Sequence, residues 1–130
     1  MDKIEQFLEC SKFAVAGAST DREKYGNKVL RCFKQNNRSV VPINPKDGVV
    51  EDLNAVKSVG ELPDDIEALS IVTPPPVTAK IVDAAIEKGI MQLWMQPGSE
   101  NEEAIKKAVN AGANVIYGGD CILVAMGYRE

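Results

Sequence analysis

Short apolar runs alternate along this chain with segments in which apolar residues recur at helical spacing. The runs of strand length are residues 12–16, 39–43, 68–72, 90–95 and 115–117. Such alternation is typical of repeated βαβ units, which build a parallel sheet covered by helices on both faces. We therefore expect residues 1–130 to form one α/β domain with a three-layer, Rossmann-like, doubly wound sheet of about five parallel strands.

Helices are expected in four segments: residues 2–10, residues 25–36, the segment from the proline run to residue 88, and residues 99–112. Ser99 followed by Glu102 predicts a capping box at the start of the last of these helices. Residues 49–53 are expected to form a short edge strand, and residues 56–62 a single turn. The apolar residues 122–126 do not distinguish between helix and strand.

The first predicted strand runs directly into a turn of small residues. The stretch Phe13-Ala14-Val15-Ala16-Gly17-Ala18-Ser19-Thr20 is followed by the helical pattern that begins at Tyr25. This is the layout of a βα unit in which backbone N–H groups and a helix N-terminus receive a phosphate. A plain strand-to-helix turn is the alternative. The candidate phosphate-binding residues are Gly17, Ser19, Thr20, Arg22 and Lys24.

The residues after the second predicted strand argue against NAD as the ligand. An NAD-binding chain usually places an Asp or Glu about 20 residues beyond its glycines, where the carboxylate holds the ribose hydroxyls. Here the sequence reads Asn44-Pro45-Lys46. A cation in place of the carboxylate favours a ligand with a second, ribose-attached phosphate. A solvated surface lysine is the alternative for Lys46.

Composition excludes several classes of function. The chain has 15 Lys and Arg against 19 Asp and Glu and no basic stripe, so no nucleic-acid partner is expected. The apolar runs are too short to cross a membrane, and the charged N-terminus predicts no secretory signal. We therefore expect a cytoplasmic protein.

Cysteine and histidine usage narrows the chemistry. Cys10, Cys32 and Cys121 are widely separated, and the chain has no histidine, which leaves a metal site almost without ligands. Reduced thiols are expected. The missing histidine also removes the usual general base and the phosphohistidine route to phosphoryl transfer.

Small and polar residues also follow the other predicted strands, in the tripeptides Thr73-Pro74-Pro75, Gln96-Pro97-Gly98 and Gly118-Gly119-Asp120. In an open parallel sheet, ligands bind beyond the carboxyl ends of the strands. Each tripeptide alone is explained by a helix start, a turn or a cap, and Trp94 is expected in the core. Their occurrence at every strand end predicts a ligand site along this edge.

Four motifs occur in order along the chain: Val15-Ala16-Gly17-Ala18-Ser19, Tyr25-Gly26, Val41-Pro42-Ile43-Asn44-Pro45 and Val72-Thr73-Pro74-Pro75. Together they resemble the small stand-alone CoA-binding proteins, which are similar to the N-terminal domain of the succinyl-CoA ligase alpha subunit. The resemblance continues through Trp94-Met95-Gln96-Pro97-Gly98 to Asp120-Cys121 and covers nearly the whole chain. It implies a Rossmann-like domain that binds coenzyme A across the carboxyl ends of its strands.

The same resemblance implies a role for each motif along the ligand. The diphosphate is expected at Gly17, Ala18, Ser19 and Thr20, with help from Arg22 or Lys24. The adenosine is expected between Asn44, Pro45 and Lys46, with Lys46 near the 3′-phosphate. Thr73, Pro74 and Pro75 border the path from adenine to pantetheine, and Gln96 and Gly98 the pantetheine end.

The ligase that the chain resembles needs a phosphorylated histidine and further domains for its reaction, and this chain has no histidine. The sequence thus favours a module that binds CoA or an acyl-CoA and does not catalyse. A small NADP-dependent or other nucleotide-binding enzyme is the alternative, since Lys46 suits a 2′-phosphate equally well. A further alternative is a regulatory or assembly subunit whose ligand site is vestigial, acting as a homo-oligomer or with a protein partner. Cys121 is either a buried structural cysteine or a thiol placed to form a mixed disulfide with CoA.

Overall fold

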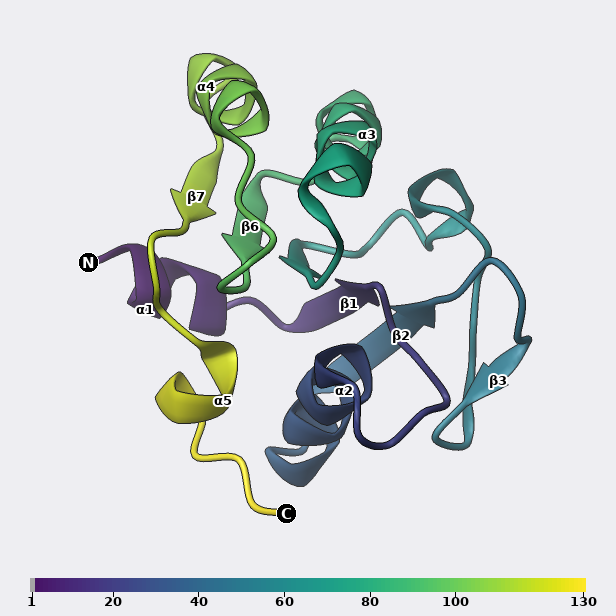
Figure 1. Ribbon diagram of the computed structural model, residues 1–130. Coiled ribbons are helices and arrows are strands. Elements are labelled where there is room, and N and C mark those ends of the chain that lie inside the picture. Colours follow the sequence, from purple (N-terminus) through teal and green to yellow (C-terminus); the bar gives the residue numbers. More distant parts are fainter. Residues whose placement is uncertain (1) are drawn as a thin grey trace.

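Five parallel strands form the central sheet of the computed structural model, which describes residues 2–130, in the order β2–β1–β5–β6–β7 (Figure 1). The strands are β1 (Lys12–Ala16), β2 (Ser39–Ile43), β5 (Ala68–Ile71), β6 (Gln92–Met95) and β7 (Asn114–Ile116). The chain adds strands on one side of β1 and then on the other, so the strand order reverses between β1 and β5. Such a switch point leaves a crevice beyond the strand ends.

Helices cover both faces of the sheet, and a three-residue 3₁₀ helix lies beside α3 (Figure 1). They are α1 (Lys3–Leu8), α2 (Tyr25–Gln35), η1 (Val59–Glu61), α3 (Pro75–Lys88), α4 (Glu102–Asn110) and α5 (Ile122–Ala125). The predicted three-layer, Rossmann-like α/β fold is confirmed. The proline run begins α3, and Gly89 ends it with a left-handed backbone, as expected.

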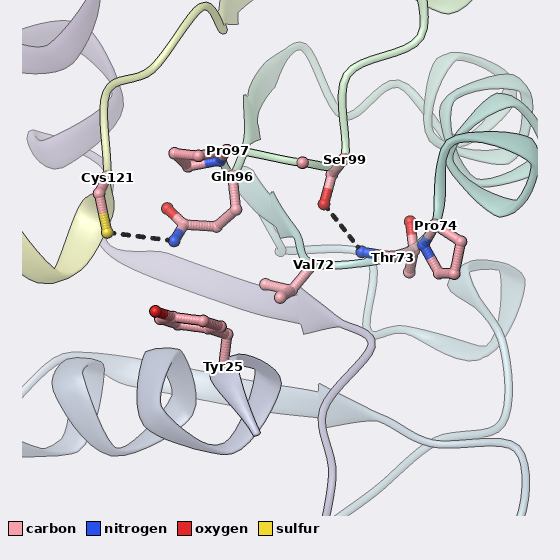
Figure 2. Close-up of a pocket in the computed structure, with 9 residues that line it drawn as sticks. Tyr25, Val72, Thr73, Pro74, Gln96, Pro97, Ser99 and Cys121 are labelled. Atoms are coloured by element: carbon pink, nitrogen blue, oxygen red, sulfur yellow. Dashed lines mark hydrogen bonds between the residues drawn. The ribbon is translucent and has the colours of Figure 1, made fainter. Parts of the chain in front are cut away.

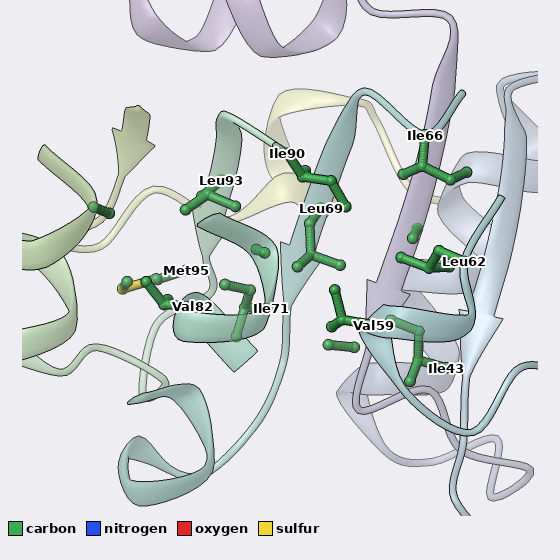
Figure 3. Close-up of a cluster of buried hydrophobic side chains, with 14 of the residues drawn as sticks. Ile43, Val59, Leu62, Ile66, Leu69, Ile71, Val82, Ile90, Leu93 and Met95 are labelled. Atoms are coloured by element: carbon green, nitrogen blue, oxygen red, sulfur yellow. The ribbon is translucent and has the colours of Figure 1, made fainter. Parts of the chain in front are cut away.

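The strands are almost wholly buried because each face of the sheet packs against helices. On one face, Leu69 and Ile71 of β5 and Leu93 of β6 pack beneath α3 and α4, and Figure 3 shows this cluster. On the other face, Phe13 packs with Trp94 and the residues of α1 and α2. Trp94 is fully buried, as expected, and its indole N–H donates to the carbonyl of Asp120 at 2.9 Å.

Two sequence expectations on local structure were wrong. Residues 49–53 form no edge strand of the main sheet; they lie in an antiparallel hairpin of β3 (Val49–Val50) and β4 (Leu53–Asn54). The chain reverses there because Glu51 and Asp52 both have positive φ, 49° and 65°. The cap of α4 is not Ser99 but Asn101, whose side chain accepts from the N–H of Ala104 at 3.1 Å.

The hairpin is tied to α2 through the carboxylate of Glu51. The buried amide of Asn27 donates to this carboxylate at 3.1 Å and to the carbonyl of Ser19 at 2.8 Å. The guanidinium of Arg22 pairs with the same carboxylate at 3.3 Å, and that of Arg31 donates to the Asn27 side chain at 2.7 Å. The Asn27 hydrogen bond and then the nearby cations hold the pKa of Glu51 below its usual range. This network fixes the loop between β1 and α2.

Two glycines allow α2 to lie against the end of β1. A Cβ atom on Gly26 would be 1.9 Å from the carbonyl oxygen of Gly17, and one on Gly17 would be 2.0 Å from that of Val72. Gly17 also has a φ of +87°, which side chains disfavour. The β1 loop, the first turn of α2 and the end of β5 therefore touch through their backbones.

We expect Gly26→Ala to destabilise the protein by about 3 kcal/mol and to lower Tm by roughly 10 °C, because α2 must move away from the Gly17 carbonyl. Thermal unfolding followed by circular dichroism measures this change. Gly48→Ala is the matched control, since a Cβ atom there meets nothing within 4 Å. Equal Tm values for the two variants would contradict the packing argument.

A second prediction concerns Glu51. Because the folded state lowers its pKa, its contribution to stability is present above the unfolded pKa of about 4.3 and is lost as pH falls through the folded pKa. Glu51→Gln should therefore lower Tm at pH 7. The difference in Tm between the variant and the wild type should become smaller below about pH 4. Glu87→Gln, at an exposed position of α3, is the control. A gap that does not vary with pH would refute the electrostatic role of Glu51.

Candidate functional site

Two adjoining cavities lie at the carboxyl ends of the strands, where the strand order reverses between β1 and β5. The first, here named the Gly17 cavity, has a volume of about 450 Å³ and lies between the β1 loop, the start of α2 and the residues after β2. The second, the Gln96 cavity, has a volume of about 540 Å³ and lies beyond β5 and β6. Both are lined by Tyr25, Val72, Thr73 and Pro74, so they form one continuous groove.

The structure brings most of the sequence-predicted site residues into this groove. Those lining the Gly17 cavity are Gly17, Ala18, Ser19, Lys24, Asn44, Pro45, Lys46, Thr73 and Pro74. Gln96 and Gly98 line the Gln96 cavity, together with Thr73 and Pro74. Thr20, Arg22 and Pro75 line neither cavity.

The cations at the Gly17 cavity differ in their availability. Arg22 is already engaged with Glu51, and its carbonyl accepts from the guanidinium of Arg31 at 2.8 Å. Lys24 and Lys46 are exposed and form no ion pair within residues 2–130. Lys24 is also the N-cap residue of α2 and makes no capping hydrogen bond with its side chain. The cavity therefore combines an open helix N-terminus with two free ammonium groups, which suits an anion.

Asn44 shapes the Gly17 cavity from within the fold. Its side chain is nearly buried and donates to the carbonyl of Ala18 at 3.1 Å. Its amide oxygen accepts from the N–H groups of Lys46 and Asp47 at 2.7 and 2.8 Å. The asparagine thus joins the loop after β2 to the loop after β1, and it holds the Lys46 backbone at the rim.

The Gln96 cavity is bordered by side chains from four parts of the chain, as Figure 2 shows. The buried amide of Gln96 donates to the sulfur of Cys121 at 3.3 Å and accepts from the N–H of Ile122 at 2.8 Å. On the opposite side, the Ser99 hydroxyl accepts from the N–H of Thr73 at 3.1 Å (Figure 2). These bonds fix the cavity walls, whose remaining surface is mainly carbon from proline, valine and tyrosine side chains.

Cys121 lies at the start of α5 and is half-buried at the edge of the Gln96 cavity. Cys32, on α2, is fully buried, and this burial, with a smaller contribution from the Cys121 thiol, raises its pKa to about 11. Of the three cysteines, Cys121 lines the groove, whereas Cys10 and Cys32 line neither of its cavities.

Sequence reasoning missed several residues that line or support the groove. Tyr25, whose side chain is 63% exposed, stands between the two cavities; the sequence marked it only as part of the Tyr25-Gly26 motif and assigned it no contact with a ligand. The sequence pattern of Ser99 predicts a helix cap, whereas its hydroxyl accepts a hydrogen bond from the N–H of Thr73. Asn27 and Glu51 support the loop through contacts 24 residues apart in the chain, which no local pattern reveals.

Within residues 2–130, no group of three or more His, Cys, Asp or Glu side chains is placed to hold a metal ion. The same part of the chain contains no helix that is long and apolar enough to cross a membrane.

Comparisons with known proteins agree on the family. The family model described as "CoA binding domain" matches residues 11–127. The chain is 31% identical over 129 residues to the alpha subunit of ADP-forming acetate–CoA ligase II from Pyrococcus furiosus, covering 92% of this chain and 28% of the subunit. It is 34% identical over 77 residues to ADP-forming acetate–CoA ligase from Methanocaldococcus jannaschii, covering 59% of this chain. The chain thus spans only 28% and 11% of the lengths of these two relatives.

Solved structures give the same result. A conserved hypothetical protein from Pyrococcus furiosus has a TM-score of 0.83 and 38% identity, covering 88% of this chain and 97% of its own. A hypothetical protein from Pyrococcus horikoshii has a TM-score of 0.88 and 32% identity, covering 95% of this chain and 86% of its own. A dinucleotide-forming acetyl-coenzyme A synthetase from Ca. Korarchaeum cryptofilum has a TM-score of 0.77 and 26% identity, covering 91% of this chain and 27% of its own. With a family model matching most of its length and relatives of this similarity, the chain belongs to the CoA-binding domain family.

Proposed function

We propose that this chain binds coenzyme A, or an acyl-CoA, along the groove formed by the Gly17 and Gln96 cavities. The observation that carries the proposal is the continuity of these cavities in a member of the CoA-binding domain family. One end of the groove offers free ammonium groups, and the other is mainly apolar. CoA has the same polarity, with phosphates at one end and a thiol-bearing pantetheine arm at the other.

In this arrangement the diphosphate lies at Gly17, Ala18 and Ser19, where the first turn of α2 faces the cavity. Lys24 and Lys46 neutralise its charge. The pantetheine arm then passes Thr73 and Pro74 into the Gln96 cavity, with Tyr25 covering it. Thr20, Arg22 and Pro75 are proposed as neighbours that support this path, since they lie next to lining residues in the chain.

We propose a binding role without catalysis for these residues. The chain has no histidine to carry a phosphoryl group or act as general base. The chain spans only 28% and 11% of the lengths of the two matched ADP-forming ligases, so we do not assign their whole reaction to it. A small NADP-dependent enzyme is the competing hypothesis, because Lys46 also suits a 2′-phosphate.

CoA should raise the Tm of the purified protein. At a CoA concentration a hundredfold above Kd, binding adds about 2.7 kcal/mol to the free energy of unfolding. Dephospho-CoA should give a smaller shift, because it lacks one phosphate. Differential scanning fluorimetry with CoA, dephospho-CoA and NADP, each at millimolar concentration, distinguishes the hypotheses. A shift with NADP and none with CoA would favour the enzyme, and no shift with CoA would end the proposal.

Replacing Lys24 or Lys46 with glutamine should weaken CoA binding about tenfold each, since each ammonium group contacts a phosphate. The measurement is isothermal titration calorimetry at low and high salt, where the variants should also show a weaker salt dependence. Lys106→Gln, on α4 and outside both cavities, is the matched control. If Lys24→Gln and Lys46→Gln both bound CoA as tightly as the wild type, the anion site would lie elsewhere.

A further inference from the structure

A third cavity adjoins the Gly17 cavity on the side of the sheet covered by α3. It has a volume of about 360 Å³, and it shares Gly17, Pro45 and Thr73 with the Gly17 cavity. Its walls are η1 with the residues before it and one face of α3. The other lining residues are Ile43, Lys57, Ser58, Val59, Val77, Lys80, Ile81 and Ala84. We name it the Lys57 cavity.

The walls of the Lys57 cavity are mainly carbon, and two lysines, Lys57 and Lys80, are among the residues that line it. Val77, Lys80 and Ile81 recur at helical spacing, so one face of α3 presents both apolar and basic side chains to the cavity. Lys57 approaches from the opposite wall, in the segment before η1. A flat apolar group with an attached phosphate fits this combination.

The lysines of this region stand out by their lack of partners. Within residues 2–130, most lysines form an ion pair, a hydrogen bond or a cation–π contact. Those without such a contact are Lys24, Lys46, Lys57, Lys80 and Lys106. All except Lys106 line the Gly17 or the Lys57 cavity. Because acidic residues outnumber basic ones in the chain, 19 to 15, this unpaired cluster indicates a site for a polyanion.

Only one part of CoA carries both an aromatic ring and a phosphate monoester, namely the adenosine 3′-phosphate. A phosphate monoester has a charge of about −1.5 to −2 at pH 7, so two ammonium groups match it. On the basis of the proposed function, we propose that Lys57 and Lys80 bind the 3′-phosphate and give the site its preference for CoA over dephospho-CoA. Lys46, to which the sequence assigned this contact, then acts on the diphosphate.

Isothermal titration calorimetry with CoA and dephospho-CoA tests this assignment. In the double variant Lys57→Gln/Lys80→Gln, CoA should bind about tenfold more weakly, while the Kd of dephospho-CoA should stay within about twofold of the wild type. Lys46→Gln should weaken the binding of both ligands by a similar factor and so preserve the ratio of their Kd values. Lys106→Gln should change neither ligand, and the two single variants at Lys57 and Lys80 should each show part of the effect.

The other outcomes each overturn the assignment. The 3′-phosphate does not lie at Lys57 and Lys80 if the double variant keeps the wild-type ratio of the Kd of dephospho-CoA to the Kd of CoA. The same conclusion follows if Lys46→Gln alone lowers this ratio. If the wild type binds both ligands equally, the site has no preference to explain. In all three cases the proposed CoA binding still stands, whereas a wild type that binds neither ligand overturns both. Adenosine 3′,5′-bisphosphate, titrated against adenosine 5′-phosphate, provides an independent comparison on the same variants.

Discussion

The close backbone contact at the switch point determines the rest of the site. Gly17 lies against the carbonyl of Val72, and Gly26 lies against the carbonyl of Gly17, so three chain segments meet without intervening side chains. This contact places the open N-terminus of α2 beside the ends of β1 and β5. A side chain at Gly26 would push α2 away from the Gly17 loop, and one at Gly17 would push that loop away from the end of β5, so the adjoining cavity would change shape.

A second layer of polar contacts fixes the loops around this point. The amide of Asn27 holds the Ser19 loop, and that of Asn44 holds the loop after β2. Gln96 plays the same role between β6 and α5. Each amide is buried and hydrogen-bonded, which is the usual condition for polar groups in a protein interior. The rigid groove therefore depends on three amides, only two of which belong to recognisable motifs.

The sequence predicted the layers and the main strands because apolar periodicity and glycine positions are local signals. It failed where contacts between distant residues decided the structure. Ser99 and Glu102 match a capping box, but the helix begins after Asn101 because Ser99 is drawn inward by the Thr73 N–H. The site shows the same division. Strand-end motifs located most lining residues, whereas Arg22 is turned from the cavity by Glu51, a residue on a hairpin with no motif of its own.

The state of the polar groups in the Gln96 cavity bears on whether this domain acts on a bound thioester. Gln96 uses both ends of its amide within the fold, and the hydroxyls of Ser99 and Thr73 are engaged with Thr73 and Thr78. The Tyr25 hydroxyl and the Cys121 sulfur, which accepts from the Gln96 amide, then remain to meet a ligand. A phenol or thiol becomes an effective nucleophile only beside a base or a strong positive charge. The chain has no histidine, and the lysines that line the groove stand at the Gly17 cavity, so among the described residues no imidazole or ammonium group lines the Gln96 cavity beside Tyr25 or Cys121.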